Sequence, residues 1–164
     1  MGEQNKSRLQ RICSISKYLV LACVVIIVLS LVGTLGLMAM MLADSSFVPN
    51  GMTRDDFWFY SVLTIFNLVT NVFLFYVLYL FTKSVGDNNS PFTSGNVRLL
   101  KMMAVILLIG WVVALVVILV LSSVLSVTIP GINGDALLMA GIVYVISLVF
   151  EYGVRLQEDS DSIV

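Results

Sequence analysis

Four long stretches without a charged side chain constrain this chain more than any other feature. The first three run over residues 18–43, 57–82 and 102–127, where Pro130 and Gly131 follow and stop the third. Each stretch exceeds the ~20 apolar residues that a helix needs to cross a bilayer. The spacing of the charges therefore predicts an all-α, polytopic membrane protein that forms one domain over residues 1–164.

The fourth neutral stretch is the shortest. Between Asp135 and Glu151 only 15 residues are neutral, which make about 22 Å of helix against a hydrocarbon core of ~30 Å. Nine of them are Leu, Ile, Val or Phe, so the summed insertion free energy, roughly −3 to −5 kcal/mol, favours insertion. We expect a fourth transmembrane helix over 134–154, with one or both carboxylates near a membrane interface, and a four-helix bundle.

The composition excludes two other classes of protein. Hydrophobic residues make up 59% of the chain and charged residues 12%, about half the charged fraction that soluble domains carry. Disordered chains are poor in apolar residues, so disorder is excluded too. A cleavable signal peptide is an alternative for the first stretch, but its length exceeds the roughly 7–15 apolar residues of such a peptide.

The basic residues predict the orientation, because Lys and Arg resist translocation across the membrane. Eight of the nine flank one side of the predicted spans, in the N-terminal segment, the middle loop and the C-terminal tail. Arg54 is the one basic residue on the other side. We therefore expect both termini in the cytoplasm and external loops at 44–56 and 128–135.

A polar stripe runs along the second predicted helix. It consists of Ser61, Thr64, Asn67 and Asn71, with Thr70 at its border. At 100° per residue these side chains share one half of the helix and should face other helices. Two interpretations stay open: hydrogen bonds across the bundle, each worth about 0.6–2 kcal/mol, or the polar lining of a cavity or pore.

The sequence contains no recognisable pattern of catalytic residues. The chain has no histidine, and no Cys or carboxylate cluster has the spacing of a metal site or a charge relay. The central parts of the first three spans hold no Asp, Glu, Lys, Arg or His, which leaves Glu151, at the end of the fourth span, as the candidate for proton-coupled transport. We expect no enzyme activity, no metal, no cofactor and no direct binding of nucleic acid.

The middle loop contains a helix start. Pro91 and Phe92 precede Thr93, a good N-cap residue, and Asn96 lies three positions further, where its side chain can bond back to the cap. Arg98 and Lys101 follow three residues apart on one face, at the level of the lipid headgroups. The loop is thus predicted to begin the third helix with a basic face that can hold anionic lipid.

The C-terminal tail, residues 155–164, continues the helical pattern of the fourth span. Glu151 and Arg155 form an i, i+4 pair, which supports the continuation. Three acids then follow, Glu158, Asp159 and Asp161. They are either a solvated helix end or an acidic site for a basic cytoplasmic partner.

The loop and the tail together resemble a known family. The similar segments are Ser-Pro-Phe-Thr-x-x-Asn-Val-x-x-Leu at 90–100, Phe150-Glu151-Tyr152-Gly153, Leu156-Gln157-Glu158 and Ser160-Asp161. They resemble the bacterial four-helix membrane proteins of domain of unknown function family 2975, and the layout and length are similar over the whole chain. The family's usual ending, Asp-Leu-Thr-Val or similar, differs from the Asp-Ser-Ile-Val found here.

The resemblance implies a location and a partner. It implies the cytoplasmic membrane of a bacterium, and a gene beside that of a small helix-turn-helix regulator of the Xre/Cro type. We hypothesise that the loop and acidic tail, with Pro91, Phe92, Thr93, Asn96 and the charged residues of the tail, bind such a regulator. The alternative is a small transporter or channel that uses Thr64, Asn67 and Asn71. A third hypothesis is an accessory subunit or homo-oligomer packed through seams of small residues, which are Ser30, Gly33 and Gly36 in the first helix, Gly110 and Ala114 in the third, and Ala136 and Ala140 in the fourth.

Overall fold

The computed structural model describes residues 3–44, 51–88, 91–125 and 134–162, and nearly all of them are helical. The helices are α1 (Glu3–Ala43), α2 (Arg54–Asn88), α3 (Ser94–Leu125) and α4 (Asp135–Ser162). All four are long and apolar enough to cross a membrane. The all-α class and the number of helices in the described chain are therefore confirmed, and the predicted turn at Pro130 and Gly131 lies outside the described residues.

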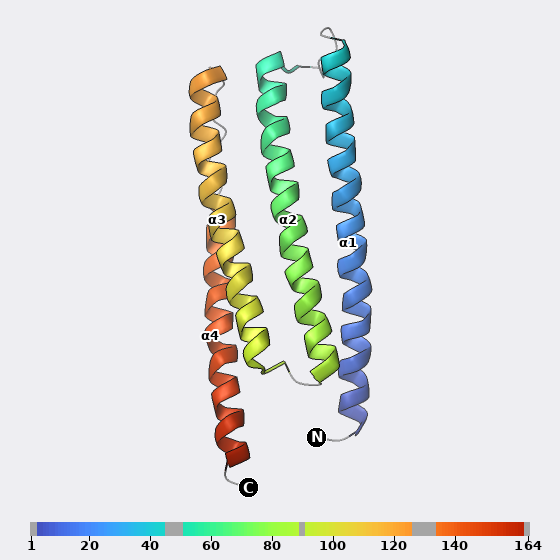
Figure 1. Cartoon of the computed structure of the whole chain (residues 1–164), viewed down its shortest axis with the longest axis vertical. Helices are drawn as coiled ribbons and strands as arrows, with labels where there is room; N and C mark the ends of the chain where they lie inside the picture. The colour runs from blue at the N-terminus through green and yellow to red at the C-terminus, as the bar shows by residue number, and fades with distance from the viewer. Residues whose placement is uncertain (1–2, 45–50, 89–90, 126–133, 163–164) are drawn as a thin grey trace.

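The helices stand in an open row (Figure 1). α1 packs against α2, α2 against α3, and α3 against α4. Among the described residues the backbone of α1 approaches that of α2 alone, so the row does not close into the expected four-helix bundle. Because lipid tails are as apolar as leucine, no hydrophobic force drives a membrane protein to close such a row.

Large apolar side chains cover the outer surfaces of the row. Leu29 in α1 is 65% exposed, Val124 in α3 is 71% exposed and Leu138 in α4 is 65% exposed. A protein in water rarely exposes apolar patches of this extent, whereas lipid accepts them. The surface agrees with a multi-pass membrane protein.

One end of the row, where α1 begins and α4 ends, carries most of the described basic side chains; we call it the basic end. They are Lys17, Lys83, Arg98, Lys101 and Arg155. The ammonium group of Lys17 in α1 lies 5.7 Å from the ring centre of Tyr79 in α2, a cation–π contact that joins the two helices there. Arg54 begins α2 at the opposite end.

The start of α4 differs from the expectation. Asp135 lies beside Asn71 and Leu74 in the middle of α2 and beside Leu107 and Gly110 in the middle of α3, where they line one cavity. In Figure 1 the orange start of α4 accordingly lies partway along α3. The sequence predicts Asp135 at the end of an external loop instead. The neutral part of α4 is too short to match α3, so a helix held at the basic end starts short of the opposite end.

The predicted packing seam on α3 is in contact with a neighbouring helix, whereas the one on α1 is not within the described chain. A Cβ atom on Gly110 would lie 2.9 Å from Cγ2 of Thr70, so α3 approaches α2 through this glycine. At Gly33 and Gly36 of α1 a Cβ would meet nothing within 4 Å. The seam predicted on α1 is therefore open within the described chain.

The start of α2 is a capping box that the sequence analysis did not identify. Thr53 Oγ1 accepts a hydrogen bond from the Asp56 amide at 3.2 Å, and Asp56 Oδ2 accepts one from the Thr53 amide at 3.2 Å. The Thr53 hydroxyl also donates to Asp56 Oδ2 at 2.7 Å. The signal was Thr-x-x-Asp before an apolar run, with Asp in place of the usual Glu or Gln.

Replacing the cap residue should loosen this end of α2. In Thr53→Ala the free energy of unfolding should fall by about 1 kcal/mol, because an amide of the first turn loses its acceptor. Unfolding in mixed detergent micelles, followed by circular dichroism, measures this. Thr53→Ser keeps the hydroxyl and should unfold like the parent protein; equal loss in both variants would contradict the cap.

Candidate functional site

The loop before α3 is held by its own polar groups at the basic end. The amide of Asn96 donates to Thr93 Oγ1 at 3.2 Å, which confirms Thr93 as the cap of α3. The side-chain nitrogen of Asn96 donates to the carbonyl of Pro91 at 3.0 Å, where it joins the Thr93 amide, which donates to the same oxygen at 3.2 Å. Asn96 thus bonds further back than predicted, and its burial is complete.

Phe92 joins this loop to α4 through an aromatic cluster. Its ring centre lies 5.2 Å from that of Phe150, and the ring centre of Phe150 lies 6.0 Å from that of Phe81 in α2. Gly153 lies under the Phe92 ring: a Cβ there would be 2.5 Å from Cδ1. The cluster of Phe81, Phe92 and Phe150 therefore holds α2, the loop and α4 together, and a glycine is needed for the loop to lie so close.

Glu151 binds two cations in the same region. Oε2 of Glu151 lies 2.7 Å from Nζ of Lys101 in α3, and Oε1 lies 3.1 Å from Nη2 of Arg155. The Arg155 contact is the predicted i, i+4 pair, whereas the sequence analysis did not identify Lys101 as a partner. All three side chains keep some solvent access, so the ion pairs fix geometry more than they add stability. They set the register of α4 against α3.

The acidic end of α4 continues from this site. Residues 155–160 are helical and exposed, including Glu158 and Asp159. The Ser162 hydroxyl donates to the carbonyl of Asp159 at 2.7 Å in the last turn. Asp161 lies in the same helix, and its side chain is outside the described part. The predicted helical continuation of the fourth span is therefore confirmed.

The loop and tail residues thus form one region in space. The contacts of Phe92 with Phe150 and Gly153 bring the loop of Pro91, Thr93 and Asn96 to the part of α4 that carries Glu151 and Arg155, although about sixty residues separate the two segments in the chain. Sequence reasoning missed the contacts of Phe81, Phe150 and Gly153. The available signal was Gly153 itself, because a glycine inside a helix costs ~1 kcal/mol and so indicates a packing reason.

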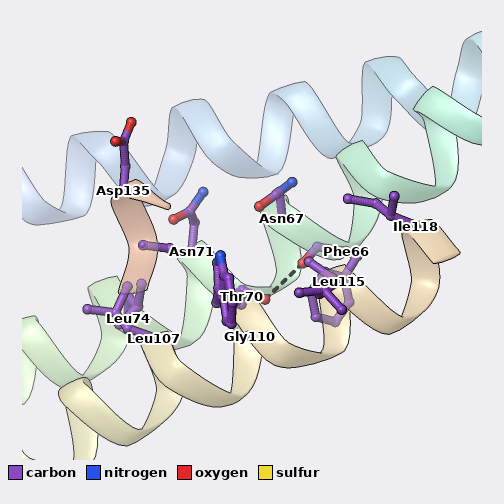
Figure 2. Close-up of a pocket in the computed structure, with 13 residues that line it drawn as sticks. Phe66, Asn67, Thr70, Asn71, Leu74, Leu107, Gly110, Leu115, Ile118 and Asp135 are labelled. Carbon is purple, nitrogen blue, oxygen red and sulfur yellow. Dashed lines mark hydrogen bonds between the residues drawn. The ribbon is translucent and has the colours of Figure 1, made fainter. Parts of the chain in front are cut away.

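A second polar region is a cavity of about 390 Å³ between α2, α3 and the start of α4. Its polar lining is Asn67, Thr70 and Asn71 from α2 and Asp135 from α4 (Figure 2). Trp111 of α3, Ala136 of α4 and apolar residues of α2 and α3 form the rest of the wall. The sequence identified the two asparagines but not Asp135, because it placed that carboxylate in the loop.

The polar stripe of α2 lines this cavity only in part. Asn67 and Asn71 line it, whereas Thr64 is exposed and outside the lining. The side-chain nitrogen of Asn67 donates to the carbonyl of Leu63 in its own helix at 3.2 Å, and among the described residues this bond does not cross to another helix. Where α2 and α3 separate around a cavity, the nearest acceptor is the carbonyl four residues back.

Water or a small polar ligand suits this cavity. Asn67 and Asp135 are exposed where they line it, and with Asn71 their carboxamide and carboxylate groups offer the two to four polar partners that a bound water needs. Within the described ranges, no three His, Cys, Asp or Glu side chains gather where they could hold a metal ion.

Comparison with known proteins gives one family. The model of the family described as Protein of unknown function (DUF2975) matches residues 48–164, which include α2, α3, α4 and both polar regions. No curated protein and no solved structure matches the chain.

The contact of Phe92 with Gly153 predicts opposite effects of one substitution in two backgrounds. Gly153→Ala should destabilise the parent protein, because the new methyl group displaces the Phe92 ring. In a Phe92→Ala background the clash is gone, so the same change should stabilise α4 by up to ~1 kcal/mol through its better helix propensity. Unfolding in detergent measures both; the same sign in both backgrounds would contradict the contact.

Proposed function

Since the chain belongs to the family of proteins of unknown function DUF2975, whose match includes the loop and the acidic end of α4, we propose that it is a membrane interaction protein that binds a basic cytoplasmic partner there. The partner proposed is a helix-turn-helix transcription regulator. The membrane proposed is the cytoplasmic membrane of a bacterium, with both termini in the cytoplasm.

The observation that carries the proposal is the unbroken course of α4. The helix runs from Asp135 to Ser162, past the ends of α2 and α3 (Figure 1). The ion pairs of Glu151 and the aromatic cluster hold it where it leaves the row. A rigid acidic helix loses less entropy on binding than a flexible tail would, which favours a function in binding.

The negative charge at the end of α4 favours a partner with a basic surface. Glu158 and Asp159 are exposed, and the negative end of the helix dipole adds to their potential. A regulator that binds DNA phosphates carries a basic surface, which is complementary to such a helix. The membrane protein would then compete with DNA for that surface, and the complex would weaken as salt concentration rises.

Neutralising the acidic end should therefore weaken binding. In Glu158→Gln with Asp159→Asn and Asp161→Asn, we expect recovery of a co-expressed helix-turn-helix regulator to fall at least fivefold in pull-downs from detergent at low salt. Asp87→Asn removes another exposed carboxylate near the basic end and is the matched control. Equal recovery with the triple variant and the parent protein would overturn the proposal.

The cavity favours a second candidate function, a small transporter or channel. A carboxylate among apolar helices is expensive, and such residues usually mark a pathway for a substrate or an ion. Asp135 shares its cavity with Asn67 and Asn71, halfway along α2 and α3. A structural alternative is that water in the cavity solvates the first amide groups of α4, which have no partner within the helix.

Flux distinguishes these two roles of the cavity. In proteoliposomes, Asn67→Leu or Asn71→Leu should lower proton or potassium flux at least fivefold if the cavity conducts. Thr64→Val alters the same stripe outside the cavity and should leave flux unchanged. Absence of flux in the parent protein would remove the transport function and leave the solvating role.

A further inference from the structure

Two hollows lie along the junction of α3 and α4, apart from the cavity already described. The first has about 440 Å³ and lies at the basic end, where Arg98, Lys101, Glu151, Arg155 and Glu158 contribute its charged groups. The second has about 390 Å³ and lies deeper among the apolar residues. Their walls come from the same two helices.

The two hollows lie in line on one side of the helix pair. Arg98 and Val105 are seven residues apart in α3, as are Lys101 and Leu108, so each pair shares a face two turns apart. Glu151 and Tyr144 have the same spacing in α4. From Arg98 to Leu108 the distance along α3 is about 15 Å, the depth of one leaflet's hydrocarbon.

The hollow at the basic end has more cationic than acidic groups. Three are cationic and two are acidic: Arg98, Lys101 and Arg155 against Glu151 and Glu158. Glu151 forms an ion pair with Lys101 through one carboxylate oxygen and with Arg155 through the other. Arg98 is exposed and forms no ion pair with any described residue. A guanidinium group offers donors that fit two oxygens of a phosphate at once. The chemistry of this hollow therefore suits a phosphate group.

The deeper hollow suits a hydrocarbon chain. Small residues, Ala104, Ala140 and Gly141, keep its floor low, and Leu108 and Tyr144 stand at its sides. A Cβ on Gly141 would meet nothing within 4 Å, so the space above this glycine is open. Apolar walls at this depth hold an acyl chain by contact alone.

We propose that the groove formed by these two hollows binds one anionic phospholipid, with its phosphate at Arg98 and an acyl chain over Ala140 and Gly141. A free phosphate would use the first hollow alone, and a neutral lipid the second alone. The anionic phospholipid is the ligand that uses both. The inference depends on the protein lying in a membrane, and it is independent of the proposed partner.

Native mass spectrometry of the full chain in detergent tests this inference. The protein is titrated with phosphatidylglycerol or with phosphatidylcholine of the same acyl chains. We expect the first phosphatidylglycerol to bind about fivefold more tightly, the preference that one basic residue at a membrane surface provides. Arg98→Gln should abolish the preference, whereas Lys83→Gln, an exposed basic residue of α2 near the same end, should keep it.

The acyl chain is tested separately. Gly141→Leu fills the deeper hollow where a side chain has room, so the variant should fold and bind both lipids more weakly while the preference stays. Equal binding of the two lipids to the parent protein, or an unchanged preference in Arg98→Gln, would overturn the proposal. Displacement of the lipid by inorganic phosphate at equal concentration would assign the site to free phosphate and overturn it too.

Discussion

The register of α4 against α3 is the constraint from which the other features of the basic end and the cavity follow. Lys101 and Glu151 meet at 2.7 Å, and Phe92 lies on Gly153 two residues further along α4. With these contacts made, the apolar part of α4 reaches only partway along α3, and its last turns project past α2 and α3. A shift of one helical turn, about 5.4 Å, would separate both contacts at once.

That register explains why polar groups gather at the start of α4. A helix that starts among apolar helices leaves several amide groups without a partner, and each costs several kcal/mol in hydrocarbon. The start of α4 is surrounded by Asp135, Asn67 and Asn71. Their side chains therefore provide polar surface near the first amide groups of the helix. The cavity and the projecting acidic helix thus both follow from the position of α4 along α3.

Much of the fold could be predicted from the sequence because the spacing of charges follows directly from the thickness of a bilayer. The cap at Thr93, the Glu151–Arg155 pair and the helical tail are local, and local patterns predicted them. The position of Asp135 depends on a contact between α3 and α4, which no local pattern encodes. The open row was missed for a similar reason, since it depends on which faces the lipid covers.

The open row also bears on what the protein can bind. α1 packs against α2, and no described residue lies within 4 Å of the position that a Cβ on Gly33 or Gly36 would take. The family match covers residues 48–164, so both polar regions lie within it while α1 precedes it. Loop, ion pairs and acidic helix all belong to α2, α3 and α4, which are joined by side chains at the basic end. At this end α4 is therefore joined to α3 through Lys101 and to α2 through Phe81, whereas α1 is joined to α2 through Lys17.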